Sequence, residues 1–187
     1  MLKANDLRPG KVVNHEGALY SVKEARHVAK GNKRSYMQLK LKNFTTGQII
    51  DHRANVDDMF ETPFLSTKEY EYLYRDGNDL ILADVETYDQ IPVPVDMVGD
   101  DMKWLKENFR ITANLVDGKM VSVELPNVVE LAVTDTPPVV KGATATNQNK
   151  DAELETGAKV KVPPFIENGE LLRIDTRTGE YIERAKS

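Results

Sequence analysis

Short runs of alternating apolar and polar residues, separated by glycine turns, fill most of the chain and predict β-strands. Asp117-Gly118 lies between two such runs and is the kind of turn that closes a tight hairpin. The same pattern predicts strands over residues 12–13, 18–23, 36–42, 48–53, 70–74, 80–83, 115–116, 120–124, 158–162, 171–175 and 181–182. Short strands at this even spacing are typical of small β-barrels, so an all-β fold is predicted.

One segment has a different period. Met102, Leu105 and Phe109 recur at helical spacing behind two acidic residues, which predicts a helix over residues 100–109. Trp104, the only tryptophan, lies beside this stripe. We expect it to be a core anchor.

Prolines mark two boundaries, at Pro63 and at Pro126. They divide the chain into three predicted modules, residues 1–64, 65–127 and 128–187. A module of about 60 residues is near the lower limit for independent stability. We therefore expect the modules to pack on one another through short joints.

The composition offers little to catalysis. Cysteine is absent, which excludes disulfides, thiolate zinc sites and cysteine nucleophiles. The remaining classical metal ligand is histidine, of which the chain has three. The carboxylate pairs Asp57-Asp58 and Asp100-Asp101 are adjacent residues, whose side chains point different ways on regular structure. We expect no enzymatic activity, no catalytic residue, no cofactor and no metal.

No run approaches the roughly 20 apolar residues of a membrane-spanning helix. The first ten residues lack the apolar core of a secretory signal. A cytoplasmic protein without a membrane partner is therefore expected.

The chain has a net charge of −5, and this charge is distributed unevenly along the sequence. Residues 1–64 carry a net +4, whereas residues 65–127 carry −7 and residues 128–187 carry −2. The basic residues of the first module concentrate in one stretch with Glu24 as its only acid: Lys23, Arg26, Lys30, Lys33, Arg34, Lys40 and Lys42. Charge alone leaves two interpretations open, a surface that binds a polyanion and an ordinary solvated hairpin face.

Spaced motifs along the whole chain carry a family resemblance. They are Pro9-Gly10, Lys40-Leu-Lys-Asn43, Thr46-Gly47, Gly99-Asp100, Lys103-Trp-Leu105, Pro126-Asn127, Lys150-Asp-Ala152, Val162-Pro163 and the tail from Arg173 to Arg184. With this set the chain resembles bacterial elongation factor P over essentially its full length.

The resemblance implies a fold and a function. The fold is an SH3-like (KOW-type) barrel followed by two OB-fold barrels, arranged as an elongated L. The function is that of a translation elongation factor that binds both ribosomal subunits beside peptidyl-tRNA. Such a factor promotes peptide-bond formation at stalled polyproline sequences by positioning the tRNA acceptor end. The resemblance also implies that the protein is a monomer and is not an enzyme.

The resemblance places the working tip of the family in the first module. An ungapped alignment back from Lys40 puts Asn32 where the family has a lysine, and Lys30 replaces the expected proline. Lys30, Gly31, Asn32, Lys33 and Arg34 are therefore the predicted contacts to the acceptor end or to ribosomal RNA. Whether Asn32 or Lys33 forms the apex stays open, as does whether a tip-modifying enzyme acts at either position.

Two further sites are implied. Gly99, Asp100 and Asp101 match a loop that faces mRNA, although helix capping is the alternative for the two acids. Tyr181 and Arg184 match positions that contact the small subunit, although Tyr181 is equally placed to be a barrel residue.

A second function class competes with the translation factor. OB barrels also occur in free-standing proteins that bind single-stranded nucleic acid. That interpretation requires exposed aromatic residues on a basic face. The chain has 7% aromatic residues and acidic second and third modules, which disfavours it.

Overall fold

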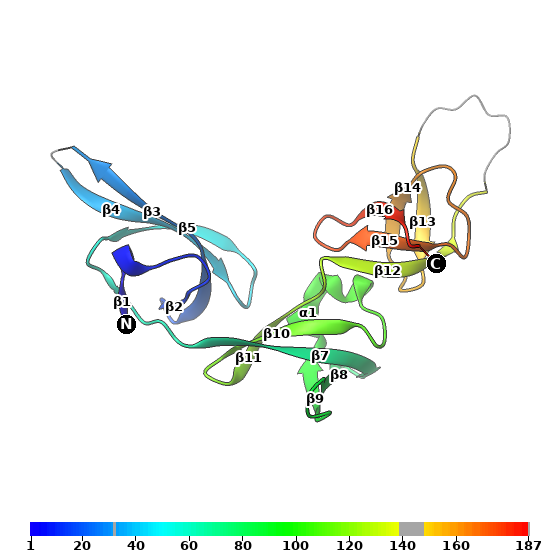
Figure 1. Ribbon diagram of the computed structural model, residues 1–187, viewed down its shortest axis with the longest axis horizontal. Coiled ribbons are helices and arrows are strands. Elements are labelled where there is room, and N and C mark those ends of the chain that lie inside the picture. Colours follow the sequence, from blue (N-terminus) through cyan, green and yellow to red (C-terminus); the bar gives the residue numbers. More distant parts are fainter. Residues whose placement is uncertain (32, 139–147, 187) are drawn as a thin grey trace. The chain divides into compact units, whose positions relative to one another are not determined.

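The structure is a computed structural model that describes residues 1–31, 33–138 and 148–186. Strands dominate these residues (Figure 1), and helix is limited to η1 (Ala4–Asp6), α1 (Val95–Val98) and η2 (Gly99–Trp104). The predicted all-β class is confirmed. The chain groups into two compact units, residues 1–68 with 113–123 and residues 69–112 with 124–187.

A four-stranded antiparallel sheet with its strands in chain order forms most of the first unit. Its strands are β2 (Val12–His15), β3 (Ala18–Lys30), β4 (Lys33–Asn43) and β5 (Ile49–Asn55). Glu16 and Gly17 join β2 to β3 with φ angles of 52° and 80°, the left-handed conformation that a two-residue hairpin turn requires. Beside this sheet β1 (Leu2–Lys3) pairs with β6 (Met59–Phe60).

The predicted period-two strand over residues 36–42 is confirmed. Met37, Leu39 and Leu41 of β4 are buried, while the alternate polar residues are half-buried or exposed. Strand alternation sends these three side chains to one face, where they pack into the core of the first module together with residues of β2 and β3.

The middle sheet has the order β11-β10-β7-β8-β9. Its strands are β7 (Leu65–Asp76), β8 (Asp79–Asp84), β9 (Gln90–Pro94), β10 (Arg110–Val116) and β11 (Lys119–Glu124). Asp117 and Gly118 close the predicted β10–β11 hairpin with φ angles of 49° and 79°. Residues 113–116 of β10 and 119–123 of β11 group with the first unit, and the other strands of the sheet lie wholly or mostly in the second.

The helix predicted over residues 100–109 is wrong. Gly99, at φ 64° and ψ −137°, ends α1 after one turn, and the chain is extended again at Leu105 after η2. Trp104 and Leu105 are both buried, the first at the end of η2 and the second in the extended chain that follows. The apolar spacing therefore belongs to a short 3-10 helix and the extended residues after it, not to a continuous α-helix.

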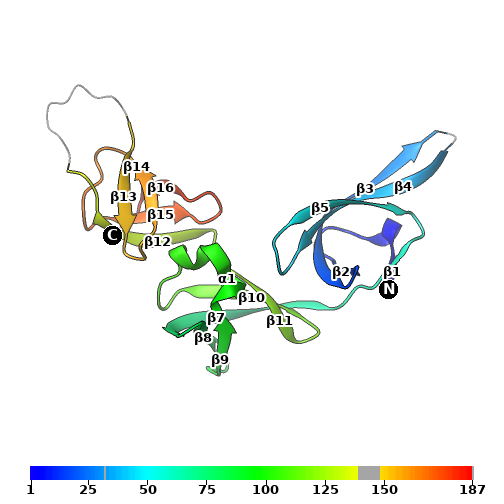
Figure 2. The ribbon, with the colours of Figure 1, turned by 180° about the vertical axis from the view of Figure 1, so that it is seen from behind.

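The C-terminal sheet is antiparallel with the order β14-β13-β12-β15-β16 (Figure 2). Its strands are β12 (Val128–Asp135), β13 (Lys150–Leu154), β14 (Lys159–Val162), β15 (Leu171–Asp175) and β16 (Glu180–Arg184). The outer strands β14 and β16 contact each other, so the sheet curls around its own core. This C-terminal core contains Val129, Leu131, Val133, Ala152, Leu154, Ala158, Val160, Val162, Ile166, Leu172 and Ile174, and Trp104 of η2 joins it.

Candidate nucleic-acid interface

Strands β3 and β4 continue as a two-stranded ribbon past the end of β5 (Figures 1 and 2). The last pair between β4 and β5 is Tyr36 with Asn55, whereas β3 and β4 stay paired as far as Lys30 with Lys33. We call residues 28–36 the tip ribbon. Apart from Tyr36, no described residue of the tip ribbon pairs with a third strand, so both edges are accessible over residues 28–31 and 33–35.

The tip ribbon carries the residues predicted for the working tip. Gly31 and Arg34 are exposed, and Gly31 has a φ of 36°. Lys30 and Lys33 are the end-paired residues of β3 and β4. Asn32 lies outside the described residues, so the choice between Asn32 and Lys33 as the apex or as a modification site stays a prediction.

Ion pairs compensate the positive charge mainly at the base of the ribbon. Glu24, the only acid in residues 23–42, lies 2.7 Å from Arg26 Nη2 and 3.6 Å from Lys40 Nζ through its two carboxylate oxygens. Among the described residues, Arg34 has no ion-pair partner. Unpaired positive charge therefore remains near the tip, where a phosphate could approach.

A cation–π contact supports the ribbon where it leaves the sheet. The guanidinium carbon of Arg53, on β5, lies 3.8 Å from the ring centroid of Tyr36 on β4. Such a contact at an exposed site contributes about 0.5–1 kcal/mol. It joins β4 to β5 at the last position where the two strands pair.

Gly99, Asp100 and Asp101 lie together at the start of η2. No side-chain hydrogen bond caps this helix, whose N-cap residue is Val98, but both acids stand in its first turn, where the helix dipole favours negative charge, so the alternative to an mRNA contact stays open. Both carboxylates are exposed. They can accept hydrogen bonds from base amines, but they repel phosphates.

Tyr181 and Arg184 lie on β16 in different surroundings. Tyr181 is half-buried and packs against the C-terminal core. Arg184 is exposed, with Nη1 3.4 Å from Glu170 Oε1 and its guanidinium carbon 4.6 Å from the Phe165 ring centroid. Glu170 and Phe165, which the sequence analysis missed, therefore hold Arg184 in place.

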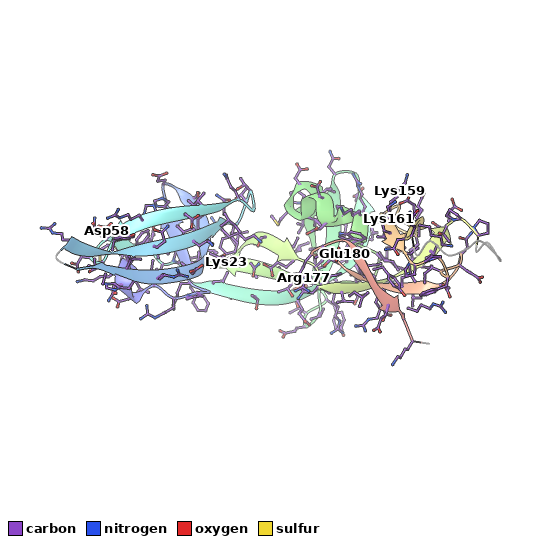
Figure 3. All side chains as sticks on the ribbon, turned by 90° about the horizontal axis from the view of Figure 1, so that it is seen from above. Lys23, Asp58, Lys159, Lys161, Arg177 and Glu180 are labelled. Carbon is purple, nitrogen blue, oxygen red and sulfur yellow. The ribbon has the colours of Figure 1, made fainter. Side chains whose placement is uncertain are left out.

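The C-terminal sheet also exposes Lys159 and Lys161 on β14 (Figure 3). Lys161 Nζ lies 2.7 Å from Asp151 Oδ1, and Glu180 lines the same surface depression. This surface is of mixed charge. The tip ribbon is therefore the stronger candidate for binding a polyanion.

Three family models match the chain in succession. "Elongation factor P (EF-P) KOW-like domain" matches residues 3–60, "Elongation factor P (EF-P) OB domain" matches residues 65–123, and "Elongation factor P, C-terminal" matches residues 129–184. The chain belongs to the elongation factor P family. This assignment confirms the resemblance, and the KOW-like and OB descriptions agree with the barrels it implied.

Relatives within the family match over almost the whole chain. Elongation factor P of Coprothermobacter proteolyticus is 41% identical over 98% of this chain and 99% of its own. The proteins of Pelotomaculum thermopropionicum and Chloroflexus aurantiacus are 44% and 45% identical, over 98% and 96% of this chain and 100% and 96% of their own. The chain is thus a translation factor of the elongation factor P family.

Solved structures show the same fold at low identity. "Eukaryotic translation initiation factor 5A from Methanococcus jannaschii" aligns with a TM-score of 0.53 and 13% identity, over 66% of this chain and 91% of that one. An initiation factor 5A family protein from Naegleria fowleri gives 0.52 and 14%, over 66% of this chain and 96% of its own. At such identities the likeness concerns the fold alone.

Two further observations concern the described part of the chain. It contains no group of three or more histidine, aspartate or glutamate side chains placed to hold a metal ion. Its helices are all too short to cross a membrane.

Proposed function

We propose that this elongation factor P family member binds the ribosome next to peptidyl-tRNA and promotes peptide-bond formation at stalled polyproline sequences. Family membership supports the general role, and the tip ribbon is the structural observation that carries the specific one. A narrow two-stranded ribbon with unpaired positive charge can enter an RNA-lined site that a whole barrel cannot.

The physical task is positioning. The ring of proline fixes φ and makes its nitrogen a constrained nucleophile, so alignment of the two substrates limits the rate. Holding the acceptor end of the tRNA in a reactive geometry lowers the entropic part of that barrier. The ribosome remains the catalyst, and the protein itself acts as a cytoplasmic, monomeric factor rather than as an enzyme.

Each candidate residue takes one role in this proposal. Lys30, Lys33 and Arg34 contact phosphates of the acceptor stem or of ribosomal RNA. Gly31 and Asn32 are the further predicted contacts of the tip, and Lys33 or the Asn32 position is where a tip-modifying enzyme would act. Intact-mass measurement of the native protein, with peptide mapping of residues 26–40, tests for that modification.

The other two sites provide orientation. Gly99, Asp100 and Asp101 face the mRNA, and Tyr181 and Arg184 contact the small subunit. Three modules, residues 1–64, 65–127 and 128–187, carry one of these sites each. The acidic second module discourages nonspecific contacts with RNA, so the basic first module sets the orientation.

A reconstituted translation assay with a polyproline reporter tests the proposal. The variant K33E/R34E should lose rescue while its far-UV circular dichroism stays that of the wild type. The control K119E/K186E reverses two exposed lysines elsewhere and should keep rescue. The slope of log affinity against log salt should become shallower by roughly one unit per lost phosphate contact.

Two outcomes would overturn the proposal. One is a polyproline reporter whose translation does not depend on the wild-type protein. The other is a well-folded K33E/R34E variant with undiminished rescue. Micromolar binding of short single strands in the absence of ribosomes would favour the single-strand-binding alternative instead.

A further inference from the structure

Trp104 lies in η2 but is buried among residues of the C-terminal sheet. Its side chain is 2% exposed and belongs to the C-terminal core. Its six-membered ring is the nearest neighbour on the side-chain face of Gly179, where an added Cβ would make ordinary van der Waals contact with it, 3.4 Å from Cζ2 and 3.8 Å from Cη2. Gly179 has a φ of 74° and belongs to the turn of the β15–β16 hairpin.

Polar contacts also join the residues on either side of Trp104 to residues 155 and 156. The Thr156 hydroxyl donates to the backbone carbonyl of Lys103, and Lys106 Nζ lies 2.9 Å from Glu155 Oε2. Glu155 Oε1 also accepts from the Ala132 N–H at 3.0 Å. Burial opposes ionisation of Glu155, but the Ala132 N–H and the Lys106 ammonium outweigh it and lower the pKa of this carboxyl.

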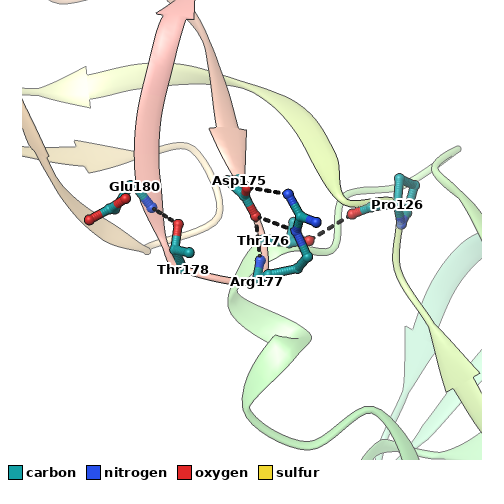
Figure 4. A network of polar contacts seen from close by, with 6 residues as sticks. All are labelled: Pro126, Asp175, Thr176, Arg177, Thr178 and Glu180. Carbon is teal, nitrogen blue, oxygen red and sulfur yellow. Dashed lines mark hydrogen bonds and ion pairs between the residues drawn. The ribbon is translucent and has the colours of Figure 1, made fainter. Parts of the chain in front are cut away.

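A second contact anchors the hairpin itself. The Thr176 hydroxyl donates to the Pro126 carbonyl at 2.7 Å (Figure 4). The next residue, Arg177, pairs with Asp175 at 2.7 Å and holds the pKa of that carboxyl down to about 2. The turn before β16 is thus held at its base by side-chain contacts, and the indole of Trp104 lies next to its last residue, Gly179.

We call the packing of Trp104 against the C-terminal sheet the joint. Each of the two proposed orientation sites lies within three residues of it in the sequence. Asp101 precedes Trp104 by three residues in η2, one turn that rises about 6 Å. Tyr181 follows Gly179 by two residues at the start of β16. A displacement of Trp104 relative to Gly179 must therefore change the distance between the Gly99–Asp101 loop and β16.

We propose that Trp104 is a positioning residue that holds the Gly99–Asp101 loop at a fixed distance from Tyr181 and Arg184, so that contact with the small subunit sets the depth of the mRNA-facing loop. This inference rests on the proposed function. Trp104 itself contacts neither RNA nor substrate. A tryptophan suits the task because it is large, has only two side-chain torsions and is locked by close packing.

The first test measures the distance directly and needs no ribosome. The chain has no cysteine, so spin labels can be placed on D96C and I182C, two exposed positions outside the proposed contacts. Pulsed dipolar spectroscopy on the full chain should give a narrow distance distribution, retained in W104F and clearly broadened in W104L. The control L82A removes a fully buried side chain of the middle sheet outside the C-terminal core and should keep the distribution narrow.

The second test separates positioning from contact in the polyproline assay. W104L should lower the maximal rescue rate by about tenfold or more, since misplacement by about 1 Å can cost up to a hundredfold. Its half-saturating concentration should change less than threefold. R184A, which removes a proposed contact, should instead raise the half-saturating concentration by a larger factor than it lowers the maximal rate.

The outcomes distinguish this inference from the proposed function. A wild-type protein without rescue refutes the proposed function. In that case the distance distribution alone decides whether Trp104 holds the loop at a fixed distance from β16. An unchanged distance distribution in folded W104L overturns the positioning role. So does a broadened distribution accompanied by a wild-type maximal rate.

Discussion

Truncation of Trp104 to alanine should strongly destabilise the second unit. The side chain is 2% exposed and contacts the C-terminal core, so its removal leaves a cavity between two parts of the chain. Truncating a buried tryptophan or phenylalanine typically costs about 3–5 kcal/mol. Whole domains are stable by only about 5–15 kcal/mol, so this loss is a large share of the total.

The size of the second unit converts this loss into a temperature. The unit comprises residues 69–112 and 124–187, about 108 residues. At about 2.1 cal/mol/K per residue, its unfolding entropy near the midpoint is roughly 0.23 kcal/mol/K. A loss of 3–5 kcal/mol therefore lowers the melting temperature of this unit by about 13–22 °C.

Scanning calorimetry and far-UV circular dichroism measure this change, because the variant no longer has tryptophan fluorescence. Phe165→Ala is the matched control, since it truncates an aromatic side chain of the same unit that is 50% exposed. We expect the control to lower the melting temperature by less than about 5 °C, which corresponds to about 1 kcal/mol. A Trp104→Ala transition within that range would show that the indole does not hold the joint.

Three further predictions concern single side chains. Burial lowers the pKa of His52 below its usual 6.5, so the unfolded chain binds the proton more readily. The free energy of unfolding should therefore fall as the pH drops below about 6.5 and level off below the pKa of His52 in the folded protein. Urea titrations at pH 7.5 and pH 5 should show this loss of stability. The variant His52→Gln should make the stability less dependent on pH over the same range. Arg53→Met removes the contact with Tyr36, worth about 0.5–1 kcal/mol, and should speed hydrogen exchange of the Tyr36 amide two- to fivefold; an unchanged rate would refute the supporting role. Phe165→Leu removes the aromatic ring that contacts the Arg184 guanidinium. The half-saturating ribosome concentration should rise two- to fivefold at an unchanged maximal rate. Equal half-saturating concentrations for variant and wild type would argue against Arg184 as a contact.

Local pattern predicted many of the hairpin strands, because hairpins depend on few neighbours, but it missed β1, β6, β9, β12 and β13. Asp117-Gly118 and Glu16-Gly17 adopt positive φ angles in two-residue turns, as the sequence indicates. The period-two alternation of β4 likewise follows from one buried face. In such elements the information lies within about ten residues.

The segment around Trp104 shows where local pattern fails. Its apolar spacing is helical, but the partners that bury Trp104 come from residues 129–174, which the spacing cannot reveal. Gly99 at φ 64° ends α1 through a local bond from its N–H to the Val95 carbonyl, whereas the burial of Trp104 depends on tertiary packing. The core role expected for Trp104 was right, although the core belongs to the next sheet.

The candidate site divides in the same way. The basic stretch was visible from charge alone, and the register of β3 and β4 shows why it forms a ribbon. The contacts of Arg184 with Phe165 and Glu170 were not visible, because they join residues that are 19 and 14 positions apart. Neither residue stands in a periodic pattern that would mark it.

The distribution of charge gives the proposed division of labour a physical reason. If basic residues covered all three modules, affinity for RNA would rise in every orientation, because phosphate contacts carry no positional information. Here the net charge is +4 in residues 1–64 and −7 in residues 65–127, so attraction to RNA favours the end that carries the tip ribbon. Attraction alone does not set depth, because Coulomb forces vary slowly over several ångströms. Depth must come from a stop with steep repulsion, and the burial of Trp104 in the C-terminal core supplies such a stop between the two orientation sites.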